Sequence, residues 1–212
     1  MAGSDAPVNG TEVQGNSAQR AQAQGNSAPD TVKILIAGGF GVGKTTMVGS
    51  VSEIVPLRTE ERLTSASLGV DDLQGLDGKK ATTVALDFGR ITMGQDLVLY
   101  LFGTPGQQRF WFMWNDLAIG ALGAVVLLDV RRPESSFAAI DFFERRGIPF
   151  VVGVNGFHGQ HPYTPEEIRE SLALPEGTKV LLCDARERES SRDVLIALLD
   201  QLIAASAKSS AS

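Results

Sequence analysis

The strongest constraint on the fold is a glycine-rich loop at 38–45, which directly follows the apolar run 32–37. The loop matches the pattern G-x-x-x-x-G-K-[ST], which is typical of phosphate-binding loops that join a short buried strand to a helix. Its glycines allow backbone N–H groups to converge on phosphate oxygens, because no Cβ obstructs the approach. The positive end of the following helix points at the same anion. The segment therefore predicts a binding site for a nucleoside triphosphate.

Individual residues of this loop have distinct predicted roles. Lys44 is expected to reach the β- and γ-phosphates, and the hydroxyl of Thr45 is expected to ligate Mg²⁺. The rest of the loop and the first helical turn supply the other phosphate contacts. The residues predicted to contact the nucleotide here are Gly38, Phe40, Gly41, Val42, Gly43, Lys44, Thr45 and Thr46.

Composition excludes several classes of function. The 212 residues allow one domain of ordinary size, and 43% hydrophobic residues are enough for a sizeable core. A formal net charge of -6, with no basic block, argues against nucleic acid as a partner. The single cysteine, Cys183, cannot form an internal disulfide, which favours a reducing cytoplasm. No apolar stretch is long enough for a membrane span and no lipidation signal is present, so any membrane association is expected to be indirect.

Three regions differ in character along the chain. Residues 1–30 contain no aromatic residue, leucine or isoleucine, so they cannot bury enough apolar area to offset their ordering entropy. We expect a disordered N-terminal tail at 1–30, a nucleotide-binding domain at 31–204 and a flexible end at 205–212.

Apolar strand-like runs alternate with helical segments in the central region, which predicts a mostly parallel sheet with helices on both faces. Six strands are expected, at 32–38, 83–91, 97–102, 124–130, 150–155 and 179–183. Five helices are expected, at 44–54, around 108–118, and at 134–146, 165–172 and 190–205. The second and third strands form a predicted hairpin, whereas the polar segment 55–81 is predicted to be a long functional loop. The predicted fold class is a three-layer α/β P-loop NTPase domain with a six-stranded sheet.

The segment 101–107, which reads Leu-Phe-Gly-Thr-Pro-Gly-Gln, ends the third predicted strand. It resembles the start of switch II in Ras-like small GTPases, and more closely that of the bacterial polarity GTPase MglA and of the GTP-binding proteins of conservon operons. The resemblance covers roughly 31–204 and implies a Ras-like fold, GTP and GDP as ligands and Mg²⁺ as cofactor. It also implies that Gly106 donates its N–H to the γ-phosphate and that Gln107 orients the attacking water.

The same resemblance implies signalling partners. Conservon operons pair such a protein with a roadblock/LC7-type small protein, which is therefore the expected regulator. Other signalling proteins of the conservon operon are further expected partners.

Thr82 and Thr83 stand at the start of the second predicted strand, where the family carries the threonine that ligates Mg²⁺ and closes on the γ-phosphate. Counting back from 86–88 favours Thr83, and the alternative is an ordinary β-branched strand start. In the MglA-like pattern an arginine precedes this threonine, but Thr82 occupies that position. Such an arginine is worth on the order of 10³–10⁵ in turnover. Slow intrinsic hydrolysis is expected, unless Arg90, Arg109 or a partner's arginine replaces it.

The acidic residue that holds Mg²⁺ is displaced relative to the family. The aspartate that begins the Asp-x-x-Gly motif is replaced by Gly103. Asp87 on the neighbouring strand is one candidate substitute. Asp129, at the end of an apolar run, is the other and would suit a general P-loop ATPase, although it could also cap a nearby turn.

The base-recognition motif Asn-Lys-x-Asp is altered at 155–158, which reads Asn-Gly-Phe-His. Asn155 is retained, but His158 cannot accept two hydrogen bonds from guanine as an aspartate does. Farther along, the resemblance implies that the N–H of Ala185 bonds the guanine oxygen. Asp184 either restores an acceptor for the base or is a solvated loop charge. Guanine is thus favoured mainly by resemblance.

Aromatic residues cluster at 110–114, directly after the switch II glutamine. Successive helical positions point about 100° apart, so these side chains cannot all face one core. They are either exposed to a partner or buried by the segment before Ala81. The pair Arg131 and Arg132 is predicted to be a surface charge at a helix end.

The leading hypothesis is a cytoplasmic GTP-binding switch with slow Mg²⁺-dependent hydrolysis, in which Gln107, Lys44 and Thr83 are catalytic and Thr45 and Thr83 ligate the metal. The nucleotide contacts predicted outside the phosphate loop are Gly106, Asn155, His158, Asp184 and Ala185. One alternative is an ATP-binding P-loop ATPase or kinase that uses Asp129. Another is a nucleotide-holding scaffold that barely turns over.

Overall fold

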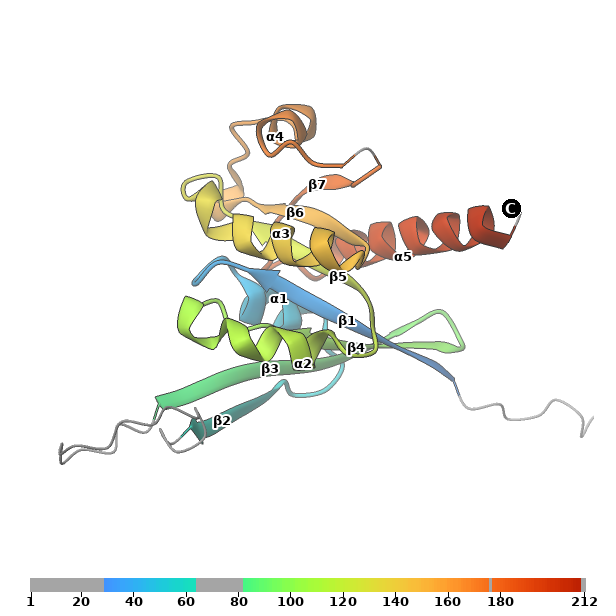
Figure 1. Ribbon diagram of the computed structural model, residues 1–212. Coiled ribbons are helices and arrows are strands. Elements are labelled where there is room, and N and C mark those ends of the chain that lie inside the picture. Colours follow the sequence, from blue (N-terminus) through green and yellow to red (C-terminus); the bar gives the residue numbers. More distant parts are fainter. Residues whose placement is uncertain (1–28, 64–81, 176, 211–212) are drawn as a thin grey trace, which may run out of the picture.

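The computed structural model describes residues 29–63, 82–175 and 177–210 (Figure 1). Its strands are β1 Asp30–Gly38, β2 Leu57–Leu63, β3 Thr82–Met93, β4 Leu97–Gly103, β5 Ala121–Leu128, β6 Phe150–Asn155 and β7 Val180–Cys183. Its α-helices are α1 Lys44–Val51, α2 Trp114–Ala118, α3 Phe137–Arg146, α4 Pro165–Ser171 and α5 Arg188–Ser210. Short 3₁₀ helices lie at η2 Gln108–Met113, η3 Pro133–Ser136 and η4 Phe157–Gly159.

One sheet runs through the molecule in the order β2-β3-β4-β1-β5-β6-β7. β3 is antiparallel to both β2 and β4, whereas the other neighbouring strands are parallel. The predicted hairpin is confirmed as β3–β4, and so is the three-layer α/β class. The sheet of the described residues has seven strands, one more than predicted. The extra strand, β2, lies in the segment that was predicted to be a loop.

The sequence of β2 explains why this segment was predicted to be a loop. Leu57 and Leu63 stand at its two ends, and the residues between them are polar or charged. Among the described strands, β2 lies at the edge of the sheet and pairs with β3 alone. Edge strands often carry charged residues that discourage further pairing, so β2 lacks the apolar alternation by which strands are recognised.

Helices cover both faces of the sheet (Figure 1). Ile34 and Ile36 of β1 belong to a core that includes residues of α1 and α5. Leu35 and Ala37 belong to a second core with residues of α2 and α3. β1 is therefore buried on both faces, which explains why it reads as one continuous apolar run.

The carboxyl ends of the parallel strands meet at one edge of the sheet. β1 lies between β4 and β5, and its last residue, Gly38, pairs with Leu127. The loops after β1, β4, β6 and β7 gather at this edge. Ligands of doubly wound sheets bind at such a place.

Several helix boundaries differ from the prediction. The helix expected around 108–118 divides into η2 and α2, and α5 continues to Ser210, beyond the expected end at 205. The start of α4 is as predicted, with Thr164 and Glu167 forming a capping box. Of the predicted disordered tail at 1–30, residues 1–28 lie outside the described residues, whereas Asp30 is the first residue of β1. None of the described helices has both the length and the apolar character that a bilayer crossing requires.

A candidate nucleotide-binding site

Three glycines of the loop after β1 adopt backbone angles that other residues rarely adopt. The φ angles of Gly38, Gly41 and Gly43 are 129°, 73° and 110°. A Cβ at Gly43 would lie 2.7 Å from Nδ2 of Asn155. Both the backbone and the close packing therefore require glycine here, as the phosphate-loop pattern predicts.

Lys44 begins α1, and its side chain folds back over the loop. Its Nζ donates hydrogen bonds to the carbonyl oxygens of Gly38 at 2.9 Å and Gly39 at 2.6 Å. Burial lowers the pKa of Lys44 to about 8, and the nearby Asp87 carboxylate opposes this shift only in part. A buried ammonium group gains strongly from an anionic group placed beside it, so a phosphate is its natural partner.

Asp87 supplies the carboxylate beside the phosphate loop. Oδ2 of Asp87 accepts a hydrogen bond of 2.5 Å from Oγ1 of Thr45. Asp87 pairs with Gly103 across β3 and β4, and a Cβ at Gly103 would lie 3.0 Å from the Cβ of Asp87. Asp87 thus fills the space that an aspartate at position 103 would occupy. Of the two candidates for the displaced acidic residue, Asp87 is the one that meets Thr45.

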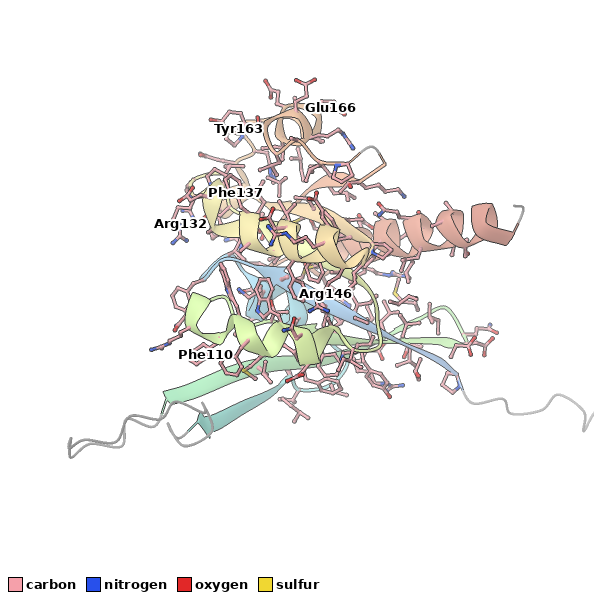
Figure 2. All side chains as sticks on the ribbon, viewed as in Figure 1. Phe110, Arg132, Phe137, Arg146, Tyr163 and Glu166 are labelled. Carbon is pink, nitrogen blue, oxygen red and sulfur yellow. The ribbon has the colours of Figure 1, made fainter. Side chains whose placement is uncertain are left out.

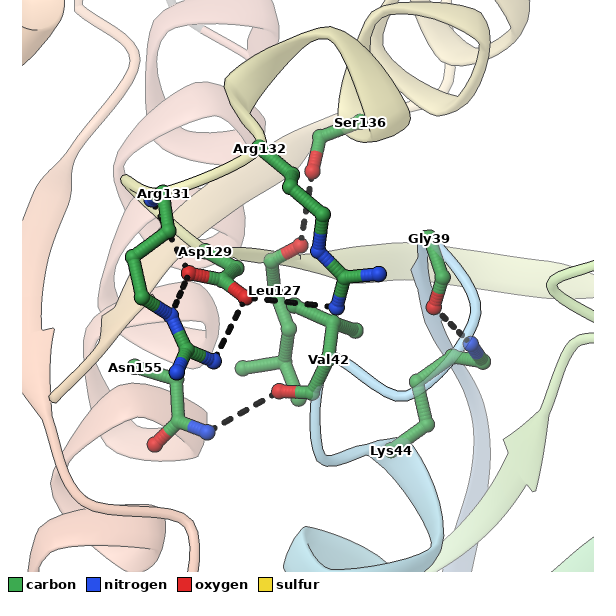
Figure 3. A network of polar contacts seen from close by, with 9 residues as sticks. All are labelled: Gly39, Val42, Lys44, Leu127, Asp129, Arg131, Arg132, Ser136 and Asn155. Carbon is green, nitrogen blue, oxygen red and sulfur yellow. Dashed lines mark hydrogen bonds and ion pairs between the residues drawn. The ribbon is translucent and has the colours of Figure 1, made fainter. Parts of the chain in front are cut away.

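Asp129 has different partners, although it also lies near the loop. Its buried carboxylate accepts hydrogen bonds from the backbone N and Nε of Arg131 at 3.0 and 2.8 Å, and from Nη2 of Arg132 at 3.4 Å (Figure 3). The hydrogen bonds from Arg131 hold the pKa of Asp129 below its usual range. The two arginines are about half exposed, as surface charges would be, but both are tied to this carboxylate.

A pocket of about 340 Å³ joins the phosphate loop to the segment after β4. It is lined by Phe40, Gly41, Gly43, Lys44, Thr45, Thr46, Asp87, Thr104, Pro105, Gly106, Gln107 and Phe110. A Cβ at Gly106 would lie 2.7 Å from Nζ of Lys44, so only glycine fits at this approach. The structure therefore brings Gly106 and Gln107 to the predicted phosphate contacts. Gly38 and Val42 do not line this pocket, but their carbonyl oxygens bind Lys44 and Asn155.

The structure places only the backbone of Thr83. Its backbone lies in β3, where it pairs with Arg62 of β2. Asp87 lies four residues farther along the same strand, a separation of about 13 Å. The predicted metal ligation by Thr83 therefore requires the start of β3 to rearrange.

Asn155 ties the base side of the site to the phosphate loop. Its Nδ2 donates to the carbonyl oxygen of Val42 at 2.9 Å, and its Oδ1 accepts from the backbone N of Ala185 at 2.9 Å. The N–H of Ala185, which was expected to bond the base, is thus already used within the chain. Asn155 acts here as a brace between two loops, since one amide can donate and accept at once.

A smaller pocket of about 150 Å³ lies on this side, and Asp184 lines it together with Phe157. Nε and Nη2 of Arg186 donate to the two carboxylate oxygens of Asp184 at 2.9 and 2.5 Å. These bonds lower the pKa of Asp184 to about 2. His158 lies in η4, after β6, and only its backbone is described. Arg186 therefore engages both carboxylate oxygens of Asp184, which is one of the predicted nucleotide contacts.

The aromatic cluster is partly buried and partly exposed. Trp114 is buried, and its ring lies 5.3 Å from that of Phe142 and 6.5 Å from that of Phe143, both on α3. Nε1 of Trp114 donates to the carbonyl oxygen of Pro105 at 3.0 Å. Phe112 is 47% exposed. Helix α3 therefore covers one side of the cluster, and a single aromatic ring faces outward.

The described residues fit a triphosphate chelated to Mg²⁺. A buried lysine, a glycine cradle and the Thr45–Asp87 pair converge on one pocket. No three His, Cys, Asp or Glu side chains cluster in the described part of the chain. Mg²⁺ held between a nucleotide and a protein needs only one or two protein oxygens, so the pair is sufficient.

Structural comparison places the chain among G domains. The G domain of FeoB from Methanococcus jannaschii matches with a TM-score of 0.55 at 14% identity, covering 82% of this chain and 98% of that one. The G domain of the FeoB iron transporter of T. maritima matches with a TM-score of 0.55 at 16% identity, covering 81% and 99%. The longer cytosolic domain of the T. maritima protein in its GMPPNP form gives 0.56 at 14%, covering 80% and 63%. At these identities the likeness concerns the fold.

Sequence comparison gives the family. An uncharacterized protein of Methanocaldococcus jannaschii, MJ1339, is 31% identical over 129 residues, which are 59% of this chain and 70% of that protein. The family model described as "conserved hypothetical ATP binding protein" matches residues 36–205, which include every loop of the candidate site. The chain, a nucleotide-binding protein with a P-loop G-domain fold, therefore belongs to this family of conserved hypothetical ATP binding proteins.

Proposed function

We propose that the chain is a GTP-binding molecular switch of the MglA and conservon-operon type, with slow Mg²⁺-dependent hydrolysis. The observation that carries the proposal is the composition of the 340 Å³ pocket. Lys44, the Thr45–Asp87 pair and the segment of Gly106 and Gln107 line it together. These are the parts that phosphoryl transfer to water requires.

Each of these residues has a role in the proposed reaction. Thr45 and Asp87 would hold Mg²⁺, which neutralises charge on the β- and γ-phosphates when it is bound. Lys44 binds the same phosphates, and Gln107 orients the water that attacks the γ-phosphorus. Hydrolysis is slow because Thr82 stands where MglA-like proteins carry an arginine before the switch I threonine.

The proposed switch has two moving parts. In the triphosphate state Gly106 donates to the γ-phosphate, and Thr83 leaves its position in β3 to reach Mg²⁺. Trp114 would report the first movement, because its indole N–H is bonded to Pro105, next to Gly106. The chain has two tryptophans, Trp111 and Trp114, and both lie beside this segment.

Guanine is the proposed base, and Asp184 is the proposed acceptor in place of the missing aspartate of the base motif. Adenine is the second candidate, because the family is described as ATP binding and because Arg186 occupies both oxygens of Asp184. An ATPase that uses Asp129 is disfavoured, since that carboxylate binds two arginines instead of Thr45.

The proposed partners follow from the same assignment. A roadblock/LC7-type small protein would act as regulator in the cytoplasm, together with other conservon-operon signalling proteins, and membrane contact would be indirect. Phe40 and Phe112 support a protein partner at the switch, because their side chains are 66% and 47% exposed. Phe40 lines the pocket with Gln107, and Phe112 belongs to η2, which follows Gln107 in the chain. Aromatic side chains of this kind are favoured anchors of interfaces.

The proposal is tested by three measurements on the full chain. Chromatography after denaturation identifies the nucleotide that copurifies, and GTP or GDP is expected. Phosphate release from GTP is expected to be slow, to need Mg²⁺, and to accelerate when the roadblock-type protein is added. Trp fluorescence is expected to differ between GDP and a non-hydrolysable GTP analogue. If ATP competed for the site as well as GTP does, adenine would replace guanine as the proposed base. If no phosphate were released under any condition, the chain would be a scaffold that only holds nucleotide.

A further inference from the structure

Asp129 binds two arginines with unequal strength. Nε and Nη2 of Arg131 approach the two carboxylate oxygens at 2.8 Å each, which is a bidentate ion pair. Nη2 of Arg132 approaches the same carboxylate at 3.4 Å. Bidentate pairs are the strong ones, so Arg131 alone can neutralise the buried Asp129. Arg132 is the partner that can leave.

Arg132 lies directly above the phosphate loop. Its Nη2 lies 3.9 Å from the position that a Cβ of Gly41 would take. Figure 3 shows the side chain extending from the start of η3 toward the loop, and Figure 2 places Arg132 and Phe110 at the same end of the molecule. Arg132 also lines an open cavity of about 770 Å³ together with Phe40, Gly106 and Gln107. A guanidinium group thus shares a cavity with the residue that is assigned to orient the attacking water.

We propose that Arg132 is a catalytic residue, an arginine finger that the chain supplies to its own triphosphate. This inference rests on the proposed function. In the reaction, a water oxygen forms a bond to the γ-phosphorus while the bond from that phosphorus to the β–γ bridging oxygen breaks. The products are the nucleoside diphosphate, inorganic phosphate and one proton. The guanidinium of Arg132 leaves Asp129 and stabilises the negative charge that builds up on the phosphate oxygens.

The other arginines near the site are worse placed. Arg131 stacks on the ring of Phe157 at 3.8 Å, on the base side of the site. Arg109 lines the same cavity as Arg132, but its guanidinium lies over the ring of Phe110 at 4.8 Å. Arg90 pairs with Tyr100 in the sheet, three residues or about 10 Å beyond Asp87.

Asp129 competes with the triphosphate for Arg132. This competition explains why hydrolysis is slow although the chain supplies its own arginine. Arg132 must give up an ion pair with a buried carboxylate before it can serve the triphosphate. The Gα GTPases, which carry an arginine in their own chain, turn over roughly 20 to 30 times faster than Ras without a partner, and far more slowly than Ras assisted by a partner's arginine. Arg132 therefore sets the basal rate of the isolated chain.

The test compares single-turnover GTP hydrolysis, with ATP in parallel, by the full chain and by Arg132→Ala. We expect the hydrolysis rate of Arg132→Ala to fall roughly 20- to 30-fold. Affinity for a non-hydrolysable analogue should stay within about threefold, because the arginine acts in the transition state. Wild-type protein with GDP should form an aluminium fluoride complex, and Arg132→Ala should not. Arg132→Lys should recover only part of the rate, since lysine lacks the planar fork.

Arg145→Ala is the matched control, because it removes a positive charge of the same kind from an exposed ion pair with Asp141 on α3, away from the site. Its hydrolysis rate should equal that of the wild type. The inference is overturned if Arg132→Ala hydrolyses at the wild-type rate, if its loss lies entirely in nucleotide affinity, or if Arg109→Ala carries the rate loss instead. A wild-type protein that binds GTP and ATP without hydrolysing either overturns this inference and the hydrolytic part of the proposed function together. If the wild type and Arg132→Ala both hydrolyse the triphosphate at the same rate, this inference is overturned and the proposed function is not.

Discussion

The carboxylate of Asp87 accepts a hydrogen bond of 2.5 Å from the hydroxyl of Thr45, although the first residue lies on β3 and the second on α1. The neighbouring position on β4 is Gly103, whose absent side chain leaves room for Asp87. Asp87 on β3 therefore reaches the space that a side chain at position 103 of β4 would occupy.

Asp87→Asn should weaken Mg²⁺ binding and so raise the Mg²⁺ concentration that hydrolysis needs. The amide keeps the size of the side chain but loses the negative charge that the metal requires. Loss of a partner of a metal site typically costs 10- to 100-fold in metal affinity, and we expect about that shift in the Mg²⁺ concentration for half-maximal rate. A titration of Mg²⁺ in a phosphate-release assay measures it.

Moving the carboxylate from β3 to β4 provides a rescue control. The double variant Asp87→Gly with Gly103→Asp moves the carboxylate back to β4, and the two Cβ positions lie only 3.0 Å apart. It should regain part of the Mg²⁺ affinity that Asp87→Gly alone loses. An Asp87→Asn protein with wild-type Mg²⁺ dependence would show that Asp87 does not serve the metal.

The phosphate loop and six of the seven described strands could be predicted from the sequence because each depends on local pattern. The glycines of the loop and the apolar run of β1 are contiguous in the chain. The choice between Asp87 and Asp129 could not be settled that way, because it depends on which carboxylate faces Thr45 across the sheet. β2 escaped detection since an edge strand buries little and its sequence is charged.

Lys44 should make triphosphate affinity sensitive to pH in the alkaline range. Burial lowers its pKa to about 8, so the ammonium form is present below that pH and is lost as the pH rises through it. At one pH unit above the pKa about one molecule in ten is charged, and affinity should be about 10-fold weaker at pH 9 than at pH 7. Calorimetry with a non-hydrolysable analogue measures this profile.

Lys44→Met is the control for that profile. The variant should bind the analogue weakly from pH 7 to pH 9, because it lacks the amine that titrates in this range. Wild-type affinity that stays constant to pH 9 would mean that Lys44 remains charged and that its burial has been compensated by another group.

Asn155→Ala should destabilise the domain as well as the site. The substitution removes a hydrogen bond to the carbonyl oxygen of Val42 and leaves the buried N–H of Ala185 without its acceptor. Each buried group left unsatisfied costs about 1–3 kcal/mol, so the free energy of unfolding should fall by about 2–4 kcal/mol. Urea denaturation measures the change. Asn115→Ala, at an exposed position on α2, should change it by less than about 0.5 kcal/mol, and equal losses in both variants would refute a bracing role.

Contacts between loops, such as those of Asn155, could not be predicted from the sequence. Asn155 was assigned to the nucleotide because its motif resembles a base-recognition sequence, yet its amide joins two loops of the chain itself. Arg132 was assigned to the surface, as a charge at a helix end. Its relation to Gly41 and Asp129 depends on how β5 and the phosphate loop lie side by side, which no local pattern reports.

Base selectivity should respond in opposite directions to changes at Asp184 and Arg186. Arg186→Ala removes both guanidinium hydrogen bonds from Asp184 and leaves only the backbone N–H of residue 186 on Oδ1. The carboxylate can then accept two hydrogen bonds from the guanine edge, whereas adenine offers a single donor group there. Charge-assisted hydrogen bonds are worth about 1.5–3 kcal/mol, so the ratio of ATP to GTP dissociation constants should rise about 10- to 100-fold. Asp184→Asn should lower that ratio, because the amide cannot accept in bidentate fashion. Competition binding with both nucleotides measures the ratio, and an unchanged value in both variants would mean that another residue reads the base.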